Sequence, residues 1–222
     1  GGSICASLDV AGAQINISNP DAGTISATSS SVCFVGTGTQ ISATPNGDAN
    51  VPAGYQTIYV LTSGNGLVIE QVSATPSFTV SIAGLYTIHT LVYDPSTLDL
   101  SIVVPGQTTG FDVNGLLVQG GGNICASLDV AGAPITIANP DAGTLTANNI
   151  DACGITLLTA TPDNNAVIPS GYQLIYVLTS GTGLVIEQVN STPSFTVSGN
   201  GIYTIHTLVY NPATLDLTIV VP

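Results

Sequence analysis

Four cysteines are the residues whose spacing most directly suggests chemistry. Cys5 and Cys33 are separated by the same interval as Cys125 and Cys153 in this chain of 222 residues. Even, duplicated cysteines are typical of disulfides formed in an oxidising compartment. We therefore predict one disulfide in each half of the chain, Cys5 with Cys33 and Cys125 with Cys153; the alternative is buried thiols. A zinc site is not expected, because no CxxC pair or histidine lies at ligand spacing.

The other ionisable residues do not form a catalytic set. His89 and His206 each stand between two threonines in YTIHTLVY, which indicates a packed or hydrogen-bonded strand residue. No serine or cysteine stands in a nucleophile elbow or beside a visible base. Glu70 and Glu187 lie in LVIEQV, where a buried carboxylate is one interpretation and an edge or interface position is favoured. We expect no enzymatic activity.

Calcium is the one cofactor worth considering, because it binds carboxylate and amide oxygens and often stiffens extracellular repeats. The candidate loops are residues 46–50, residues 163–165, and Asp94 together with Asp99. None has the dense alternation of acidic residues of a calcium loop, and Asp94 is replaced by Asn211 in the second half. The expectation is therefore no cofactor, with calcium as the alternative.

A repeat that spans nearly the whole chain positions these residues. Residues 55–93 return almost unchanged as residues 172–210, at an offset of 117, whereas residues 4–10 return as residues 124–130 at an offset of 120. The copies diverge most around the second cysteine and in the loops 44–52 and 161–169. Loop tips that differ between copies of one scaffold are frequent sites of binding specificity. The chain is predicted to contain two copies of one domain.

Each copy has the pattern of an antiparallel β-sandwich. Residues 55–62 and 66–72 flank Ser63-Gly64-Asn65 and predict a hairpin. Apolar and β-branched runs cut by turn residues predict further strands at 24–28, 77–80, 85–93 and 98–104. Gly84-Leu85-Tyr86 resembles the tyrosine corner of immunoglobulin-like sandwiches, in which the hydroxyl ties the preceding loop. The predicted fold is all-β, with two tandem immunoglobulin-like antiparallel β-sandwich domains.

The predicted domains cover residues 1–105 and 123–222, and the junction at residues 106–122 occurs only once. Its glycine-rich ends are typical of a linker, but its middle is too apolar for a solvated tether. We expect this junction to pair as a strand with one of the domains or to cement their contact. The apolar residues of this candidate assembly strand are Phe111, Val113, Leu116, Leu117 and Val118.

The charge balance excludes several classes of partner. The chain has no Lys or Arg against 13 Asp and Glu, for a formal net charge of −13. Nucleic acid and anionic lipid require basic groups to neutralise phosphates, so neither is expected as a partner. No run of about 18 apolar residues is present, so membrane insertion is not expected. Trypsin-like enzymes have no site to cleave, which would suit a protein that works outside cells.

The order of the motifs is similar to repeats of very large secreted surface proteins of Bacteroidota, of the kind exported by the type IX system and linked to adhesion or gliding. The stretches that carry this resemblance are DAGTISATSSSVC, TPNGDANVPAGYQTIYVLTSGNGLVIEQV, PSFTV and YTIHTLVYDPSTLDL. The resemblance covers nearly the whole chain. It implies an extracellular, cell-surface location and tandem immunoglobulin-like modules in a stalk or fibre, and it carries over no catalytic residue.

Together these features favour a non-enzymatic structural or adhesive surface protein. A sharper hypothesis makes the chain the subunit of an extracellular filament, in which residues 111–118 add as a strand to a neighbouring module. Its partners would then be copies of itself or adjacent repeats. The alternative is an adhesin module that binds surface carbohydrate or protein, with Tyr55 and Tyr172 as candidate aromatic contacts.

Overall fold

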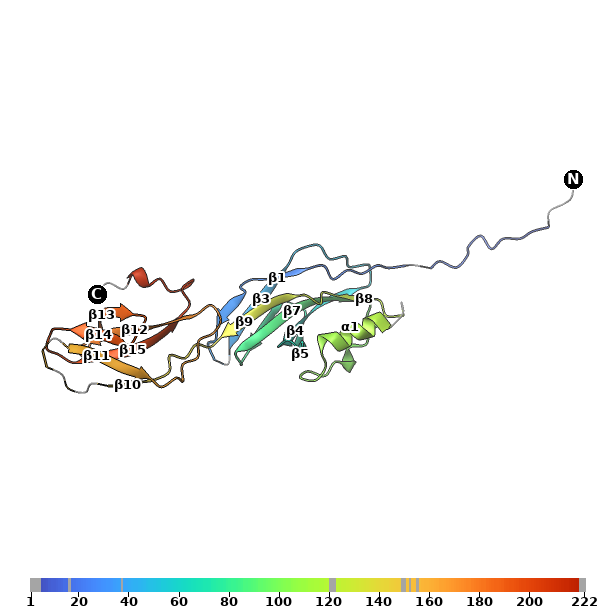
Figure 1. Cartoon of the computed structure of the whole chain (residues 1–222). Coiled ribbons are helices and arrows are strands. Elements are labelled where there is room, and N and C mark those ends of the chain that lie inside the picture. Colours follow the sequence, from blue (N-terminus) through green and yellow to red (C-terminus); the bar gives the residue numbers. More distant parts are fainter. Residues whose placement is uncertain are drawn as a thin grey trace. The chain divides into compact units, whose positions relative to one another are not determined.

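The computed structural model describes residues 5–15, 17–36, 38–119, 123–148, 151, 153–154 and 156–219. The chain divides into two compact units, Gly1–Ile137 and Ala138–Pro222. Strands are the dominant element in both units, and their pairings are antiparallel (Figure 1). The all-β prediction is confirmed.

The first unit is a sandwich of two sheets. One sheet has the strand order β1-β3-β6 and contains β1 (Ile25–Ala27), β3 (Thr39–Pro45) and β6 (Ser77–Val80). The other has the order β2-β9-β7-β4-β5, with β8 also paired to β7. Its strands are β2 (Ser31–Cys33), β4 (Gln56–Ser63), β5 (Val68–Ser73), β7 (Gly84–Tyr93), β8 (Ala126–Leu128) and β9 (Ala133–Ala138).

The second unit repeats the central part of this arrangement. One sheet has the order β10-β11-β14, with β10 (Leu145–Ala147), β11 (Thr156–Pro162) and β14 (Ser194–Val197). The other has the order β13-β12-β15, with β12 (Gln173–Ser180), β13 (Val185–Asn190) and β15 (Tyr203–Tyr210). By the sequence repeat, β10 to β15 correspond in turn to β1, β3, β4, β5, β6 and β7. The prediction of two immunoglobulin-like sandwiches is confirmed.

Two local predictions are also confirmed. The expected hairpin is formed by β4 and β5, which pair from Tyr59 opposite Ser73 to Ser63 opposite Val68. The Tyr86 hydroxyl donates to the Ile82 carbonyl at 3.0 Å, and the Tyr203 hydroxyl donates to the Gly199 carbonyl at 3.3 Å. Each tyrosine therefore ties the loop that precedes its strand, as in a tyrosine corner.

The strand predicted at residues 98–104 is wrong. This stretch contains the short 3-10 helix η1 (Leu100–Ile102), and its counterpart in the second unit is η2 (Leu217–Ile219). Asp99 caps η1 by accepting a hydrogen bond from the Ser101 amide at 2.9 Å. A side chain that bonds to the backbone two residues ahead favours a turn over an extended strand, and this local bond prevails over the apolar pattern.

The prediction that residues 111–118 form an assembly strand is also wrong, because residues 110–119 form the helix α1 (Gly110–Gln119). The Asp112 amide donates to the Thr109 hydroxyl at 3.1 Å, and the Asp112 carboxylate accepts from that hydroxyl at 2.7 Å and from the Thr109 amide at 2.9 Å. This exchange has the pattern of a capping box, which starts a helix. Val113 is buried and Phe111 is exposed, while the side chains of Leu116, Leu117 and Val118 lie outside the described residues.

Helix α1 covers the outer face of the larger sheet of the first unit. Val113 of the helix packs in one buried cluster with Val60, Ile69, Leu91, Tyr93 and Leu98. A second cluster lies between the two sheets and is formed by residues of both, among them Ile41, Leu61, Phe78 and Ile88. The central strands β4 and β7 therefore bury both faces, as their continuous apolar sequences require. Within the described residues, no helix is long and apolar enough to cross a membrane.

The structure does not support the predicted disulfides, since no cysteine of the described residues is in a disulfide. Cys125 belongs to the first unit and Cys153 to the second, so the two residues of one predicted pair lie in different units. Cys5 lies in an extended, exposed segment, while Cys33 is in β2. Cys125 and Cys153 belong to different units because the segment that carries Cys125 pairs with the sheet of the first unit.

Candidate functional site: a strand edge closed by the next repeat

The boundary between the folded units does not coincide with the boundary between the sequence repeats. The repeat begins its second copy near residue 123, yet residues 123–137 belong to the first folded unit. Strand β9 pairs with β7 in a register that sets Ile135 opposite Tyr86 and Ala133 opposite Ile88. Strand β8 pairs with the end of β7, with Leu128 opposite Leu91. The second copy thus supplies the strands that close the sheet of the first.

The side chains of β9 alternate between core and solvent, as those of a half-buried strand must. Ala133, Ile135 and Ile137 are at most 2% exposed and belong to the cluster between the two sheets. Pro134 and Thr136, which point the other way, are exposed. The Thr136 amide donates to the Ser30 carbonyl at 3.0 Å, which ties the second edge of β9 to the residue before β2. The supplied strand is therefore an interior strand of the sheet.

Strand β8 and the turn after it are held by further hydrogen bonds. The Asp94 amide donates to the Cys125 carbonyl at 2.8 Å, and the Cys125 amide donates to the Thr97 hydroxyl at 3.0 Å. The Asp129 amide donates to the Thr90 carbonyl at 3.0 Å. Residues 125–129 are thus fixed along the second half of β7.

His89 connects β4, β7 and the supplied segment. Its Nδ1 lies 2.8 Å from the Asp129 carbonyl oxygen and its Nε2 lies 2.9 Å from the Thr62 hydroxyl. A carbonyl can only accept, so Nδ1 carries the proton and Nε2 accepts from Thr62. His89 is 2% exposed, and this burial lowers its pKa, opposed by the bond to Asp129. The neutral imidazole is therefore a structural link in the fold.

Gly132 allows the supplied segment to approach β7 closely. Its φ is +56°, and a Cβ built on it would lie 2.7 Å from both His89 Nδ1 and the Ile88 carbonyl oxygen. Those distances leave no room for a side chain, and the positive φ also favours glycine. The Gly132 amide donates to the Asp129 carboxylate at 3.1 Å, which closes the turn between β8 and β9.

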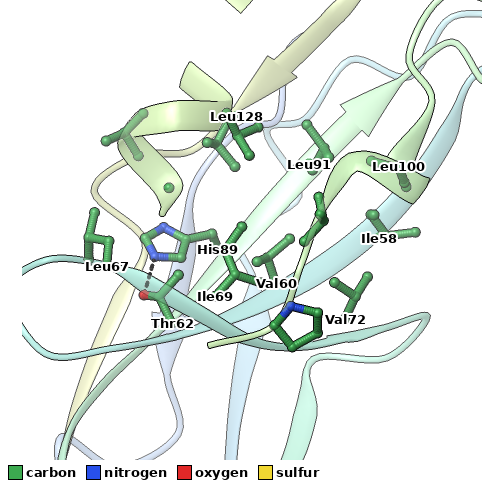
Figure 2. A pocket seen from close by; sticks show the side chains of 15 residues that line it. Ile58, Val60, Thr62, Leu67, Ile69, Val72, His89, Leu91, Leu100 and Leu128 are labelled. Atoms are coloured by element: carbon green, nitrogen blue, oxygen red, sulfur yellow. Dashed lines mark hydrogen bonds between the residues drawn. The ribbon is translucent and has the colours of Figure 1, made fainter. Parts of the chain in front are cut away.

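The supplied segment also closes one side of an apolar cavity of about 210 Å³ on the outer face of β4 and β7 (Figure 2). Leu128 and Val130 line it from this segment, and Gly110 and Val113 line it from α1. Thr62 and His89 are the polar side chains among the described residues that line it, and Figure 2 shows them bonded to each other. The described part of the lining offers apolar contact and contains no carboxylate, serine or cysteine side chain.

The corresponding edge in the second unit is open. Strand β15 pairs with β12 on one side, and no strand of the described residues lies on its other side. Among the residues that the structure describes, the cluster between the sheets of the first unit contains 11 buried residues and the corresponding cluster of the second unit contains three. Leu158, Tyr203 and Ile205 are only partly buried, although their counterparts in the first unit are buried.

A cavity of about 570 Å³ lies at this open edge. Its lining includes Leu158, Val197, Tyr203 and Ile205. The counterparts of these four residues in the first unit belong to the cluster that Ile135 and Ile137 complete. The cavity therefore occupies the place that the supplied strand fills in the first unit.

Other residues singled out from the sequence have local structural roles. The Ser63 hydroxyl donates to Glu70 at 2.5 Å, and Ser180 makes the same bond to Glu187. The pKa of the Tyr55 phenol is raised, chiefly by its interaction with the Cys125 thiol. Tyr172 is half-buried. These contacts are between neighbouring strands or turns and do not converge on a shared site.

The loops considered for calcium are occupied by internal hydrogen bonds. Asp48 accepts from the Thr24 amide at 2.8 Å and from its hydroxyl at 2.7 Å, and these bonds lower the pKa of Asp48. Asp163 accepts from the hydroxyls of Thr144 and Thr146 at 2.6 and 3.0 Å. In the part of the chain that the structure describes, no group of three or more His, Cys, Asp or Glu is placed to hold a metal ion.

Sequence reasoning did not assign the role of residues 123–138, although a signal was present. This segment and residues 3–18 follow the repeat at an offset of 120, whereas residues 55–93 follow it at 117. Both copies also alternate alanine and isoleucine with other residues at 13–17 and 133–137. That pattern is typical of a half-buried strand, but its position in sequence at the start of each copy suggests the domain that follows it, whereas residues 133–137 pair with the first unit.

Comparisons with known proteins add little to this description. No protein-family model matches the chain, and no curated protein matches it. Among solved structures, the chain is similar to the fibronectin(III)-like modules of CbhA from Clostridium thermocellum, with 15% identity over 85% of this chain and 86% of that chain and a TM-score of 0.34. The strand pairing defines the class of fold: a tandem β-sandwich repeat protein in which one repeat completes the sheet of the other.

Proposed function

We propose that this chain is a non-enzymatic structural repeat protein whose sandwiches are joined in series by strand exchange. The observation that carries the proposal is β9, which belongs to the second copy by sequence and is buried as an interior strand of the first unit. A module joined in this way cannot be pulled from its neighbour without opening a hydrophobic core. That property suits a spacer or fibre that transmits tension.

The path of the chain after β9 supports this role. Only residues 139–144 separate β9 from β10, the first strand of the second unit. The Asp141 amide and carbonyl exchange hydrogen bonds with Val167 at 3.1 and 2.9 Å, so part of this short connection is itself paired. Because the chain leaves one core and enters the next within a few residues, the connection can lengthen only slightly when the chain is pulled.

The proposed location is extracellular, in a surface stalk or adhesin fibre of the type IX-exported kind that the motifs resemble. The absence of Lys and Arg supports it, because such a chain offers no cleavage site to trypsin-like proteases. Antibodies to the chain should label intact cells of the organism that makes it. Labelling that requires permeabilised cells would contradict the surface location.

The mechanical role can be tested by pulling single molecules of the full chain from its two ends. We expect two unfolding events, and the event that releases more chain belongs to the first unit, which is the longer one. Gly132→Ala should lower the unfolding force of that event, because its Cβ has no room against His89 and Ile88. The matched control is Gly12→Ala, at the same repeat position, where a Cβ meets nothing within 4 Å.

Equal forces in the Gly132→Ala variant and the unchanged chain would contradict the proposal, because strand exchange would then not hold the first unit closed. A lower force in both alanine variants would also count against it. That result would show that replacing either glycine weakens the chain, so the effect could not be attributed to the contact of Gly132 with β7.

A further inference from the structure

The N-terminal segment matches the strand that closes the first unit. We define the donor segment as residues 8–15 together with residues 17 and 18, and in Figure 1 it is part of the extended blue end of the chain. We infer that the donor segment of one copy docks along the free edge of β15 in the second unit of another copy, so that the chain assembles head to tail. This inference rests on the proposed function, because it extends strand exchange from one chain to two.

The donor segment has the sequence that the edge requires. Its Ala13, Ile15 and Ile17 occupy the repeat positions of Ala133, Ile135 and Ile137, which fill the core of the first unit. In the donor segment these isoleucines are 85% and 92% exposed. Leu8 and Val10 are likewise exposed, and their counterparts Leu128 and Val130 line the cavity beneath α1. Four large apolar side chains near one terminus are thus uncovered in the single chain.

The donor segment already has the turn of the docked segment. Gly12 has a φ of +57°, and Gly132 in the closed unit has a φ of +56°. The Asp9 carboxylate accepts from the amides of Ala11 and Gly12 at 3.1 and 3.3 Å, and the Asp129 carboxylate accepts from Gly132 at 3.1 Å. The turn that carries the chain over β7 is therefore present before docking, which reduces the ordering cost of binding.

The acceptor edge has a defined register. Transferring the β7–β9 pairing through the repeat sets Ile15 opposite Tyr203, Ala13 opposite Ile205 and Ile17 opposite Gly201. Ile15 and Ile17 would then enter the cavity of about 570 Å³, whose lining includes all three acceptor residues. The unpaired backbone of β15 supplies the hydrogen-bonding groups, as in other complexes formed by strand addition.

His206 marks the same edge. Its Nε2 lies 2.9 Å from the Thr179 hydroxyl, which reproduces the bond between His89 and Thr62. The carbonyl of Asp129 accepts from Nδ1 of His89, and the residue that corresponds to Asp129 in the donor segment is Asp9. Docking would therefore bring the Asp9 carbonyl to His206 Nδ1 and complete the second histidine link.

The first test uses the full chain and the variant Gly12→Ala. In the single chain a Cβ at Gly12 meets nothing, whereas in the docked complex it would meet His206 and Ile205 as a Cβ at Gly132 meets His89 and Ile88. Gly47→Ala is the matched control, since Gly47 also has a positive φ and open surroundings. Each protein is refolded from denaturant at a range of concentrations, so that docking does not depend on the slow opening of an already folded chain. The size of the resulting species is then measured by sedimentation.

The unchanged chain and Gly47→Ala should form a concentration-dependent series of linear oligomers. Gly12→Ala should remain monomeric at concentrations at least tenfold higher. A chain that stays monomeric throughout, or a Gly12→Ala variant that assembles like the unchanged chain, would overturn the inference. A monomer in which the β15 amides that face away from β12 are nevertheless protected from exchange would also overturn it, because the donor segment would then close on its own chain.

The second test supplies the donor segment as a peptide of residues 5–18 with Cys5 replaced by serine. The receptor is the full Gly12→Ala chain, whose own donor segment should not compete. The peptide should slow amide exchange in β15 and produce a protected Nδ1 proton on His206, observable because the chain has only two histidines. The same peptide with Gly12→Ala is the control. No change at β15, or an equal change with both peptides, would overturn the inference.

The two proposals fail differently. If Gly132→Ala lowers the unfolding force of the first unit while the chain remains monomeric and the peptide does not bind, strand exchange within the chain stands and assembly between chains is wrong. If Gly132→Ala leaves that force unchanged, the proposed function itself is wrong.

Discussion

Replacing Ile135 with alanine should destabilise the first unit, whereas replacing Ile15 should not, although the two isoleucines occupy one repeat position. Ile135 is 1% exposed within the cluster between the sheets, and truncation of a buried isoleucine costs about 2–5 kcal/mol. Ile15 is 85% exposed, and a surface substitution of this kind changes stability by about 0.5 kcal/mol or less. The comparison therefore isolates burial from residue type.

Native-state hydrogen exchange read by mass spectrometry can measure this difference for β7 alone. Amides of β7 that exchange through opening of the unit should exchange about 30-fold to a few thousand-fold faster in Ile135→Ala, since each 1.4 kcal/mol is a factor of about ten. The measurement is made in dilute solution, where assembly through the donor segment does not contribute. Unchanged exchange in Ile135→Ala, or equal acceleration in Ile15→Ala, would refute the conclusion that β9 closes the core.

Three further outcomes are expected. Burial lowers the pKa of His89, so at pH values between this lowered pKa and the ordinary 6.5 the unfolded chain binds more protons than the folded chain. The stability of the first unit should therefore fall as the pH drops below 6.5. His89→Gln should remove this pH dependence when stability is measured by urea titration. Tyr86→Phe removes the bond to the Ile82 carbonyl and should cost about 0.5–1.5 kcal/mol, more than Tyr203→Phe, whose bond is longer and exposed; equal losses would contradict this. Dithiothreitol should leave the thermal midpoint unchanged, because the described cysteines form no disulfide; a clear decrease would show a crosslink.

Much of the sandwich could be predicted because its signals are local. The Ser63-Gly64-Asn65 turn lies between two apolar runs, so the β4–β5 hairpin follows from neighbouring residues. Tyr86 lies two residues after Gly84, at the start of a long strand, and its hydroxyl bonds to the residue four positions before it. In both cases the partner lies within a few residues, and the sequence pattern contains all the information required.

The closing strand could not be assigned because its partner is remote. Ile135 pairs with Tyr86 across residues that include α1, and nothing in the composition of residues 133–138 distinguishes the first unit from the second as its partner. The predicted pairing of Cys125 with Cys153 rests on the same assumption, namely that a cysteine folds with the nearest copy, whereas the two residues belong to different units. Hydrophobicity alone predicts a strand in the junction at 106–122, whereas the capping bonds between Thr109 and Asp112 start a helix at Gly110.

The position of β9 has a consequence for biosynthesis, because the first unit cannot close when its own seven strands have been made. Strand β7 ends at Tyr93, and the last residue of β9 that pairs with β7 is Ile137. At about 5–20 residues per second, translation leaves an interval of roughly 2–9 s in which β7 has no neighbour on that side. During this interval the unpaired edge of β7 in a nascent chain is free to pair with a strand of a neighbouring chain on the same polysome. Correct pairing requires the chain's own next repeat to leave the ribosome before such a contact forms.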